Sequence, residues 1–153
     1  MKYFSIIISI ALLMLTSTGC TRNNGDIGDW FGQWQQTEML VDGAPYAEYH
    51  GQYFWMFQND IICIMWLAPE GYAHQSYTVY GTWSEQNGSL VLNFDHNEDG
   101  DKSSIYIPFS GLHFPAGSPF SLEIVEAGSN KCNLRLVNPD DGSTYTYVLK
   151  KRG

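Results

Sequence analysis

From Trp30 to the end of the chain, apolar and polar residues alternate with a period of two, which is typical of β-strands with one buried face. In the segment 76–85, for example, Tyr77, Val79 and Trp83 share one face, and serine and threonine occupy the other. The segment 108–115 fits, at most, a helical turn. The pattern predicts an all-β domain of eight or nine strands, over residues 34–41, 52–58, 61–66, 76–85, 89–94, 104–107, 120–124, 131–136 and 144–150.

Turn residues between these segments predict that neighbouring strands pair as hairpins. Asn59-Asp60 and Asn87-Gly88 have the composition of two-residue hairpin loops, and the segments 128–130 and 140–142 are also turn-forming. A meander of this kind is expected to close into an up-and-down antiparallel β-barrel, because closure removes the exposed strand edges. A two-sheet sandwich is the alternative.

The strands at 52–58 and 61–66 are apolar on both faces, unlike the other predicted strands. The outer wall of a barrel at this point needs a dry covering, since a large exposed apolar patch favours association. The ends of the chain, a partner protein or the second copy of a homodimer are the three possible coverings.

The first twenty residues have the pattern of a secretory signal. Lys2 precedes an apolar run over 6–15, and small residues then lead to Cys20. The run is shorter than the ~20 residues that a membrane-spanning helix requires. Small residues followed by cysteine resemble the lipobox of bacterial lipoproteins, which implies lipidation of Cys20; ordinary signal cleavage is the alternative. We therefore expect a signal peptide at 1–19, a polar tether at 20–29 and a barrel domain at 30–153.

Composition narrows the possible partners. The chain has 8 basic and 16 acidic residues, and its formal net charge is -8. This balance argues against nucleic-acid binding, which depends on neutralising phosphates. Hydrophobic residues make up 44% of the chain, which excludes a disordered polypeptide.

Two cysteines remain in the predicted barrel domain, Cys63 and Cys132, and both lie in apolar strand segments. A free cysteine in such a segment behaves as a small hydrophobic residue. Exported proteins can also form disulfides. The sequence leaves open whether these residues are buried thiols or a disulfide pair.

The motifs of familiar enzyme classes are missing from the sequence. The four histidines are scattered without zinc-ligand spacing, and neither a Gly-x-Ser-x-Gly motif nor a phosphate-binding glycine loop is present. We therefore expect a protein that is not an enzyme.

One acidic segment resembles the first half of a calcium loop. Asp95, Asn97, Asp99 and Asp101 place oxygen ligands at alternate positions, and Gly100 permits a sharp turn. Tyr106 stands where an EF-hand would supply a bidentate glutamate, so we expect at most weak Ca²⁺ binding. The alternative is a simple solvated loop.

The first predicted strand opens with the motif Gly32-x-Trp34. At this position the motif resembles the N-terminal signature of lipocalins and related calycin barrels. The resemblance implies that Trp34 closes one end of the barrel, under a basic residue that follows the last strand. Residues 150–152 are all basic, and Arg152 is the predicted partner of the ring. With its signal and its terminal cysteine, the chain is similar to small lipocalin-like lipoproteins of Gram-negative bacteria.

The resemblance implies a binding protein, because lipocalin barrels hold one small ligand. With Trp34 at the closed end, the opposite end becomes the expected mouth. Strand parity assigns Tyr53, Trp55, Tyr77 and Trp83 to the lining, where aromatic rings can contact an apolar or aromatic guest.

The expected lipid on Cys20 also predicts where the protein is located. We expect an outer-membrane lipoprotein of the cell envelope, facing the periplasm because no acidic run follows Cys20. The alternative function is an envelope interaction or inhibitor module, whose barrel is filled by side chains and whose surface contacts a protein partner.

Overall fold

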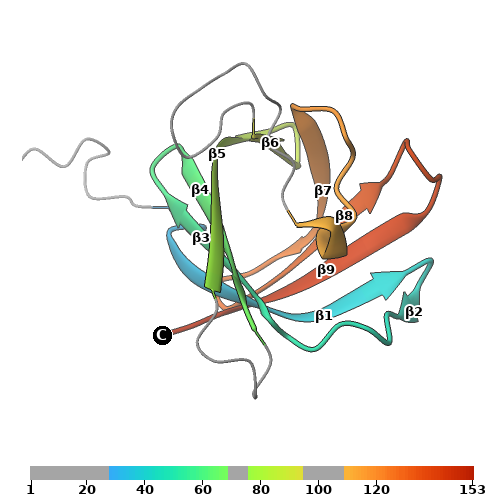
Figure 1. The fold of residues 1–153 in the computed structure, drawn as a ribbon. Coiled ribbons are helices and arrows are strands. Elements are labelled where there is room, and N and C mark those ends of the chain that lie inside the picture. Colours follow the sequence, from blue (N-terminus) through green and yellow to red (C-terminus); the bar gives the residue numbers. More distant parts are fainter. Residues whose placement is uncertain (1–27, 69–75, 95–108) are drawn as a thin grey trace, which may run out of the picture.

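The computed structural model describes residues 28–68, 76–94 and 109–153, and this part of the chain forms nine strands and one short 3₁₀-helix (Figure 1). The elements are β1 (Gly32–Val41), β2 (Ala44–Pro45), β3 (Tyr53–Gln58), β4 (Ile61–Leu67), β5 (Ser76–Gln86), β6 (Ser89–Asn93), η1 (Ser110–Leu112), β7 (Phe120–Ala127), β8 (Lys131–Val137) and β9 (Thr144–Lys151). No helix in the described ranges is long and apolar enough to cross a membrane.

The strands form one closed antiparallel barrel. Their order in the sheet is β2-β1-β3-β4-β5-β6-β7-β8-β9, and β1 also pairs with β9. Each of the other pairings, except that of β1 with β3, joins strands that follow one another in the chain. The prediction of an all-β up-and-down barrel is confirmed, with eight strands in the ring and the two-residue β2 beside β1. The segment 104–107, predicted as a strand, lies outside the described residues.

The hairpin turns explain why the strands pair in this register. Asn87 and Gly88 have φ angles of 50° and 76°, as a two-residue hairpin turn with positive φ at both positions requires. Asn59 has a φ of 51° in the β3–β4 turn. Asparagine and glycine adopt this backbone region at low cost, so both predicted loops form as expected.

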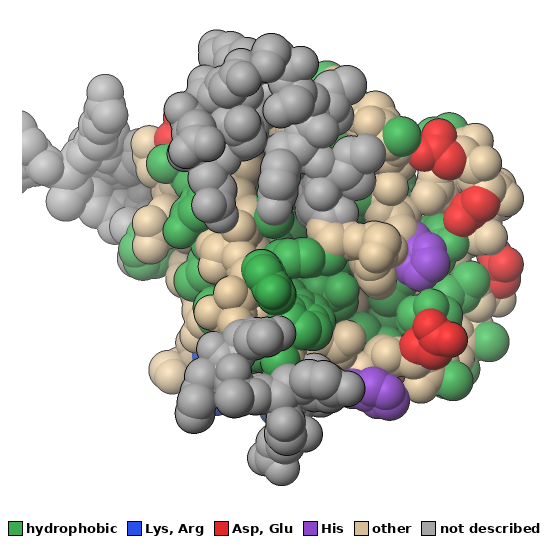
Figure 2. Space-filling model, viewed as in Figure 1, with side chains coloured by type: hydrophobic (Ala, Val, Ile, Leu, Met, Phe, Trp, Pro, Cys, Tyr) green, Lys and Arg blue, Asp and Glu red, His purple; other side chains and the backbone are tan. Residues whose placement is uncertain are grey.

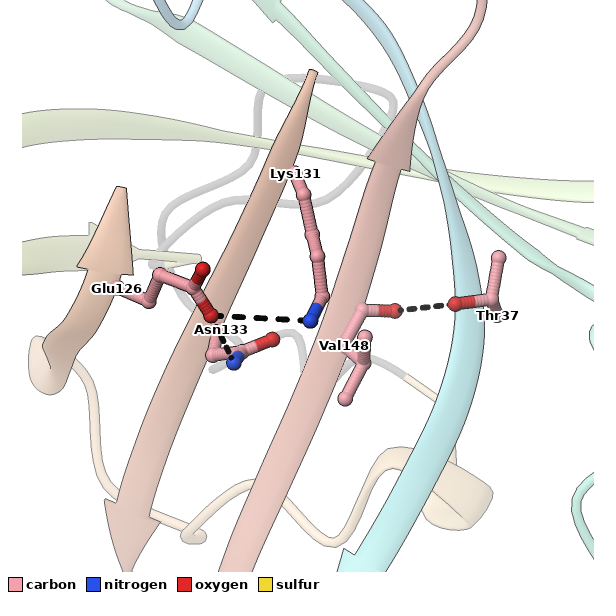
Figure 3. Close-up of polar contacts among 5 residues, drawn as sticks. All are labelled: Thr37, Glu126, Lys131, Asn133 and Val148. Carbon is pink, nitrogen blue, oxygen red and sulfur yellow. Dashed lines mark hydrogen bonds and ion pairs between the residues drawn. The ribbon is translucent and has the colours of Figure 1, made fainter. Parts of the chain in front are cut away.

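Bulges in β1 and β7 interrupt the alternation that the sequence shows. In β1 the pairing with β9 shifts between Gln36 and Glu38, so the buried positions change from Trp34 and Gln36 to Met39. The hydroxyl of Thr37, at the bulge, donates a hydrogen bond of 3.3 Å to the carbonyl oxygen of Val148 (Figure 3). In β1, simple alternation therefore predicts the wrong face for the residues after Gln36.

The centre of the barrel is filled by large side chains. The biggest fully buried residues include Trp34, Trp55, Tyr147, Phe57 and Phe94. Trp55 packs edge-on against Phe114, with ring centroids 5.7 Å apart, and its Nε1 donates to Gln36 Oε1 at 3.1 Å. Packing of this kind gives the domain its core.

Residues 109–114, which we call the mouth segment, pack into the barrel end opposite Trp34. Leu112 is fully buried, and its carbonyl oxygen accepts a 2.6 Å hydrogen bond from the Tyr147 hydroxyl. The Asn138 amide donates to the carbonyl oxygen of His113 at 2.8 Å. Figure 1 shows η1 of this segment within the outline of the barrel. The helical turn predicted over 108–115 is therefore present, and it closes over the core.

Acidic side chains line one edge of the face in Figure 2, at the place where Figure 1 shows β2 and the β8–β9 turn, while hydrophobic side chains gather nearer the centre. Asp42 and Asp141 at these turns accept hydrogen bonds from the backbone amides of Thr144 and Ser143. The Tyr145 hydroxyl also donates to Asp141 and is the main cause of the lowered pKa of that carboxyl. Asp42 and Asp141 therefore stabilise these turns through hydrogen bonds to the backbone.

The outer face of β3 and β4 is apolar, as the sequence predicts, and part of it is covered. The Arg152 guanidinium lies 5.5 Å from the centroid of the Phe54 ring, so one chain end covers this point. Further along these strands, Ile61 is 47% exposed and borders a groove of about 180 Å³. The groove, which we call the outer groove, is lined by Met56, Gln58, Ile61, Cys63 and Tyr80.

Both cysteines of the barrel are buried free thiols. Cys63 is on the outer face of β4, between the inward-facing residues Ile62 and Ile64, whereas Cys132 belongs to the core cluster. The two side chains lie on opposite sides of the barrel wall. This arrangement confirms the thiol alternative and excludes the disulfide.

Candidate functional site

A pocket of about 320 Å³ lies at the Trp34 end of the barrel. We call it the tryptophan pocket. The turn before β1, the ends of β1 and β5, and the β7–β8 hairpin contribute to its wall. Its lining residues are Gly28, Asp29, Trp30, Trp34, Trp83, Glu85, Ala127, Gly128 and Cys132.

Two indole hydrogen bonds hold the pocket together. The buried Trp34 Nε1 donates to the carbonyl oxygen of Trp30 at 2.8 Å, which fastens the turn before β1 to the barrel end. Trp30 Nε1 in turn donates to Glu85 Oε2 at 2.8 Å, across to β5. Residues 55 positions apart in the chain are joined in this way, so the pocket wall is defined before any ligand arrives.

The aromatic rings form a packed floor. The centroid of Trp30 lies 5.9 Å from that of Trp34 and 6.4 Å from that of Trp83. Phe57 lies beneath, 5.4 Å from Trp30 and 5.1 Å from Trp83. Tilted and edge-to-face contacts at these distances are favourable, and they fix the ring planes. The floor is therefore tightly packed and mostly apolar, and Trp83 Nε1 is a buried donor without a partner among the described residues.

Lys151 is the cation over Trp34, which corrects the prediction of Arg152. Its Nζ lies 5.2 Å from the ring centroid and donates to the carbonyl oxygen of Asp29 at 2.7 Å. Alternation in β9 places Tyr147 and Leu149 in the core, so residue 151 has inward parity and residue 152 does not.

Gly32 of the same motif has a φ of 117°, a conformation that side chains disfavour. A Cβ at this position would lie 3.5 Å from Cε of Lys151. The backbone thus explains the glycine of the predicted motif, and it brings the chain close to the lysine.

The thiol of Cys132 is a neutral part of the lining. Burial raises its pKa to about 12, and the charges of Glu126 and Glu85 add to the rise. A thiol with so high a pKa is a poor nucleophile. The pocket can therefore hold a molecule, but Cys132 does not equip it for thiolate chemistry.

Metal sites do not appear in the part of the chain that the structure describes. Residues 28–68, 76–94 and 109–153 contain no group of three or more histidine, cysteine, aspartate or glutamate side chains placed to hold an ion. The calcium-loop residues Asp95, Asn97, Asp99 and Asp101 lie outside these ranges, so Ca²⁺ binding stays a prediction.

The four predicted lining residues are spread along the barrel. Trp83 lines the tryptophan pocket, whereas Tyr53 and Trp55 are buried near the mouth segment. Tyr77 is 55% exposed and packs against Trp66, with centroids 5.6 Å apart. Parity predicts which side of the wall a residue faces, but it does not predict the height at which the residue lies along the barrel. This is why the structure does not bring the four residues together.

Sequence reasoning missed Trp30, Glu85 and Cys132 as pocket residues. Glu85 has the inward parity of Trp83 and lies two residues further along β5, which is a signal that the sequence contains. Trp30 precedes the first strand, so alternation says nothing of its direction.

Comparison with known proteins places the fold. No protein-family model matches the sequence, and no curated protein matches it either. A lipocalin-like protein from Bacteroides uniformis superposes with a TM-score of 0.56 over 82% of this chain and 100% of that one, at 16% sequence identity. The fold is lipocalin-like. An uncharacterized protein from Bacteroides eggerthii is also similar, with a TM-score of 0.59 over 80% of this chain and 99% of that one, at 19% identity.

Identities this low establish the fold alone. In the lipocalin-like barrel described here, the pocket lies at the Trp34 end, which the resemblance marks as closed, and the mouth segment occupies the other end. The site of this chain therefore has to be argued from its own residues.

Proposed function

We propose that this lipocalin-like protein binds a small, largely apolar ligand in the tryptophan pocket. The observation that carries the proposal is a concave site of about 320 Å³ bordered by three tryptophans. Ligand pockets commonly have volumes of ~300–1,000 Å³ and mostly apolar walls. The tryptophan pocket lies at the lower end of this range, which favours a small guest.

The size and shape of the guest follow from the cavity. An apolar cavity of ~150 Å³ binds benzene, so about 320 Å³ gives room for a molecule of two fused rings. Burying apolar surface contributes ~25 cal/mol per Å². Because hydrogen bonds fix the indoles of Trp30 and Trp34, and ring packing holds that of Trp83, little ordering of the wall opposes binding.

The filled centre of the barrel supports this location. Trp55, Phe114 and Tyr147 occupy the space that a guest would need in a hollow barrel, with ring centroids 5.5–5.7 Å apart. A ligand there would have to displace the mouth segment, which Tyr147 and Asn138 hold by hydrogen bonds. The tryptophan pocket requires no such displacement.

Titration with 2-naphthalenemethanol, followed by tryptophan fluorescence, is expected to show saturable quenching. Trp83→Ala, which removes part of the floor, and Ala127→Phe, which fills the pocket from its rim, should each weaken binding by about tenfold or more, because each removes contact surface. Trp66→Ala, near the mouth segment, is the matched control and should bind as the wild type does. Fatty acids and retinoids, tested alongside, define how large a guest fits.

Equal binding by wild type, Trp83→Ala and Ala127→Phe would contradict the proposed location. Absence of binding by every apolar ligand would contradict the proposed function. The second candidate, an envelope interaction module, would then take its place. That candidate is favoured by the filled barrel centre and by the open outer groove around Ile61.

We also propose that the protein is a lipoprotein of the outer membrane that faces the periplasm. The supporting observations are the signal-like segment that ends at Cys20 and the lack of an acidic run after it.

Replacing the proposed anchor residue, Cys20→Ala, is expected to move the protein from the membrane fraction to the soluble envelope fraction or to block its processing. Cys63→Ala changes a cysteine within the barrel and should leave fractionation unchanged, which makes it the control. Unchanged membrane fractionation and mass of Cys20→Ala would rule out the anchor.

A further inference from the structure

We infer that the tryptophan pocket prefers apolar ring systems that carry a protonated amine over the same ring systems with a carboxylate. The inference rests on the proposed function and names the class of ligand that this site would select. It depends on the charges of the wall, the orientation of one carboxylate and the chemistry of the indole faces.

The charged side chains that line the pocket, among the residues described, are both acidic. They are Asp29 and Glu85. Trp30 Nε1 donates to Glu85 Oε2 at 2.8 Å and so holds this carboxylate at the pocket wall. A carboxylate has lone pairs for further donors, so Glu85 can accept from an ammonium group and still keep its bond to Trp30.

The two neighbouring lysines, Lys151 and Lys131, are not among the lining residues. The Lys151 ammonium lies over Trp34 and donates to the carbonyl oxygen of Asp29, and Lys151 is not among the lining residues. Lys131 Nζ lies 3.7 Å from Glu126 Oε2, which also accepts a 2.7 Å hydrogen bond from the Asn133 amide (Figure 3). Lys131 is therefore paired with a carboxylate, and Lys151 lies outside the lining, over the Trp34 ring, so the carboxylates are the charges that line the pocket itself.

The behaviour of Cys132 agrees with a negative potential at the wall. Burial is the main cause of its raised pKa, and the carboxylates of Glu126 and Glu85 raise it further. Charges that disfavour a thiolate in the lining also disfavour the carboxylate of a ligand beside it.

The indole rings act in the same direction. The face of an aromatic ring carries partial negative charge, so it attracts a cation and repels an anion. Lys151 already uses one face of Trp34 in this way. A ligand amine near Trp30 or Trp83 would gain from both the ring faces and Glu85.

The test compares three ligands with one ring system: 2-naphthylmethylamine, 2-naphthalenemethanol and 2-naphthoate. Binding to the full-length protein is measured by calorimetry at pH 7 and low salt. The amine is expected to bind about two- to fivefold more tightly than the alcohol, and the carboxylate more weakly than the alcohol. This is the size expected of one exposed charge pair, and it should shrink in 0.5 M salt.

Glu85→Gln keeps an oxygen for Trp30 Nε1 and removes the charge. Within this variant, the ratio of amine to alcohol affinity should fall to near one, whatever the affinity for the alcohol itself becomes. Glu123→Gln is the matched control, since Glu123 pairs with Arg135 and does not line the pocket. It should keep the preference.

The outcomes separate the two proposals. Equal affinity for amine and alcohol, or a preference that survives Glu85→Gln, would overturn the charge selection and leave the ligand pocket in place. Failure of all three ligands to bind would overturn the proposed function and the inference with it.

Discussion

Trp55→Ala is expected to lower the free energy of unfolding by about 3–5 kcal/mol, the usual cost of truncating a large buried aromatic residue. Trp55 is 0% exposed and packs against Phe114 and Tyr147. Its removal would also leave Gln36 Oε1 without the indole donor, while Gln36 Nε2 already lacks a partner among the described residues. Urea unfolding followed by far-UV circular dichroism measures the effect.

Tyr77→Ala is the control for Trp55→Ala, because both residues are large aromatics with inward parity and they differ strongly in burial. Tyr77 is 55% exposed, so its truncation should change the free energy of unfolding by no more than about 0.5 kcal/mol. Similar losses in the two variants would mean that the barrel centre is not packed as described, and that Trp55 is available to a ligand.

Gly81→Ala is expected to destabilise the barrel by about 1–3 kcal/mol, the usual range for overpacking a core. A Cβ at Gly81 would lie 2.5 Å from the carbonyl oxygen of Asn93 and 2.7 Å from the Phe94 ring. Because one of these atoms belongs to the backbone, the sheet itself would have to move. Replacing glycine by alanine within a strand normally stabilises the folded protein. A loss of stability in Gly81→Ala would therefore point to the close contact with Asn93 and Phe94.

Gly117→Ala provides the comparison for Gly81→Ala, since nothing lies within 4 Å of a Cβ at Gly117. Thermal and urea unfolding of the two variants should therefore differ, with a loss in Gly81→Ala and little change in Gly117→Ala. A neutral or stabilising Gly81→Ala would show that β5 and β6 approach each other less closely than the structure describes.

The fold could be predicted from the sequence because its determinants are local. Alternation defines each strand, and loops such as Asn87-Gly88 define the hairpins that connect them. A chain of consecutive hairpins has few ways to bury its apolar faces, and barrel closure by β1 and β9 is one of them.

The site could not be predicted in the same way because it depends on long-range geometry. Strand parity places Trp83 on the correct face, but its companions at the barrel end are Trp30 and Cys132, which come from distant segments. The packing of the mouth segment against Trp55 depends on Leu112 and Phe114 entering the barrel, and strand parity contains no information on this.

The strand register determines that Lys151, and not Arg152, lies over the Trp34 ring. Pairing with Trp34 places Lys151 at the closed end, and the following residue turns outward to Phe54. The three consecutive basic residues 150–152 are equivalent in composition, and only the strand register distinguishes them.

The most direct test of the ligand pocket uses the five tryptophans, at positions 30, 34, 55, 66 and 83, as reporters. Their indole ¹H–¹⁵N signals, assigned with single Trp→Phe variants, are followed by NMR during titration with 2-naphthalenemethanol. We predict that the signals of Trp30, Trp34 and Trp83 shift together with ligand concentration while those of Trp55 and Trp66 stay in place. Shifts confined to Trp55 and Trp66, or no shifts at all, would contradict the account.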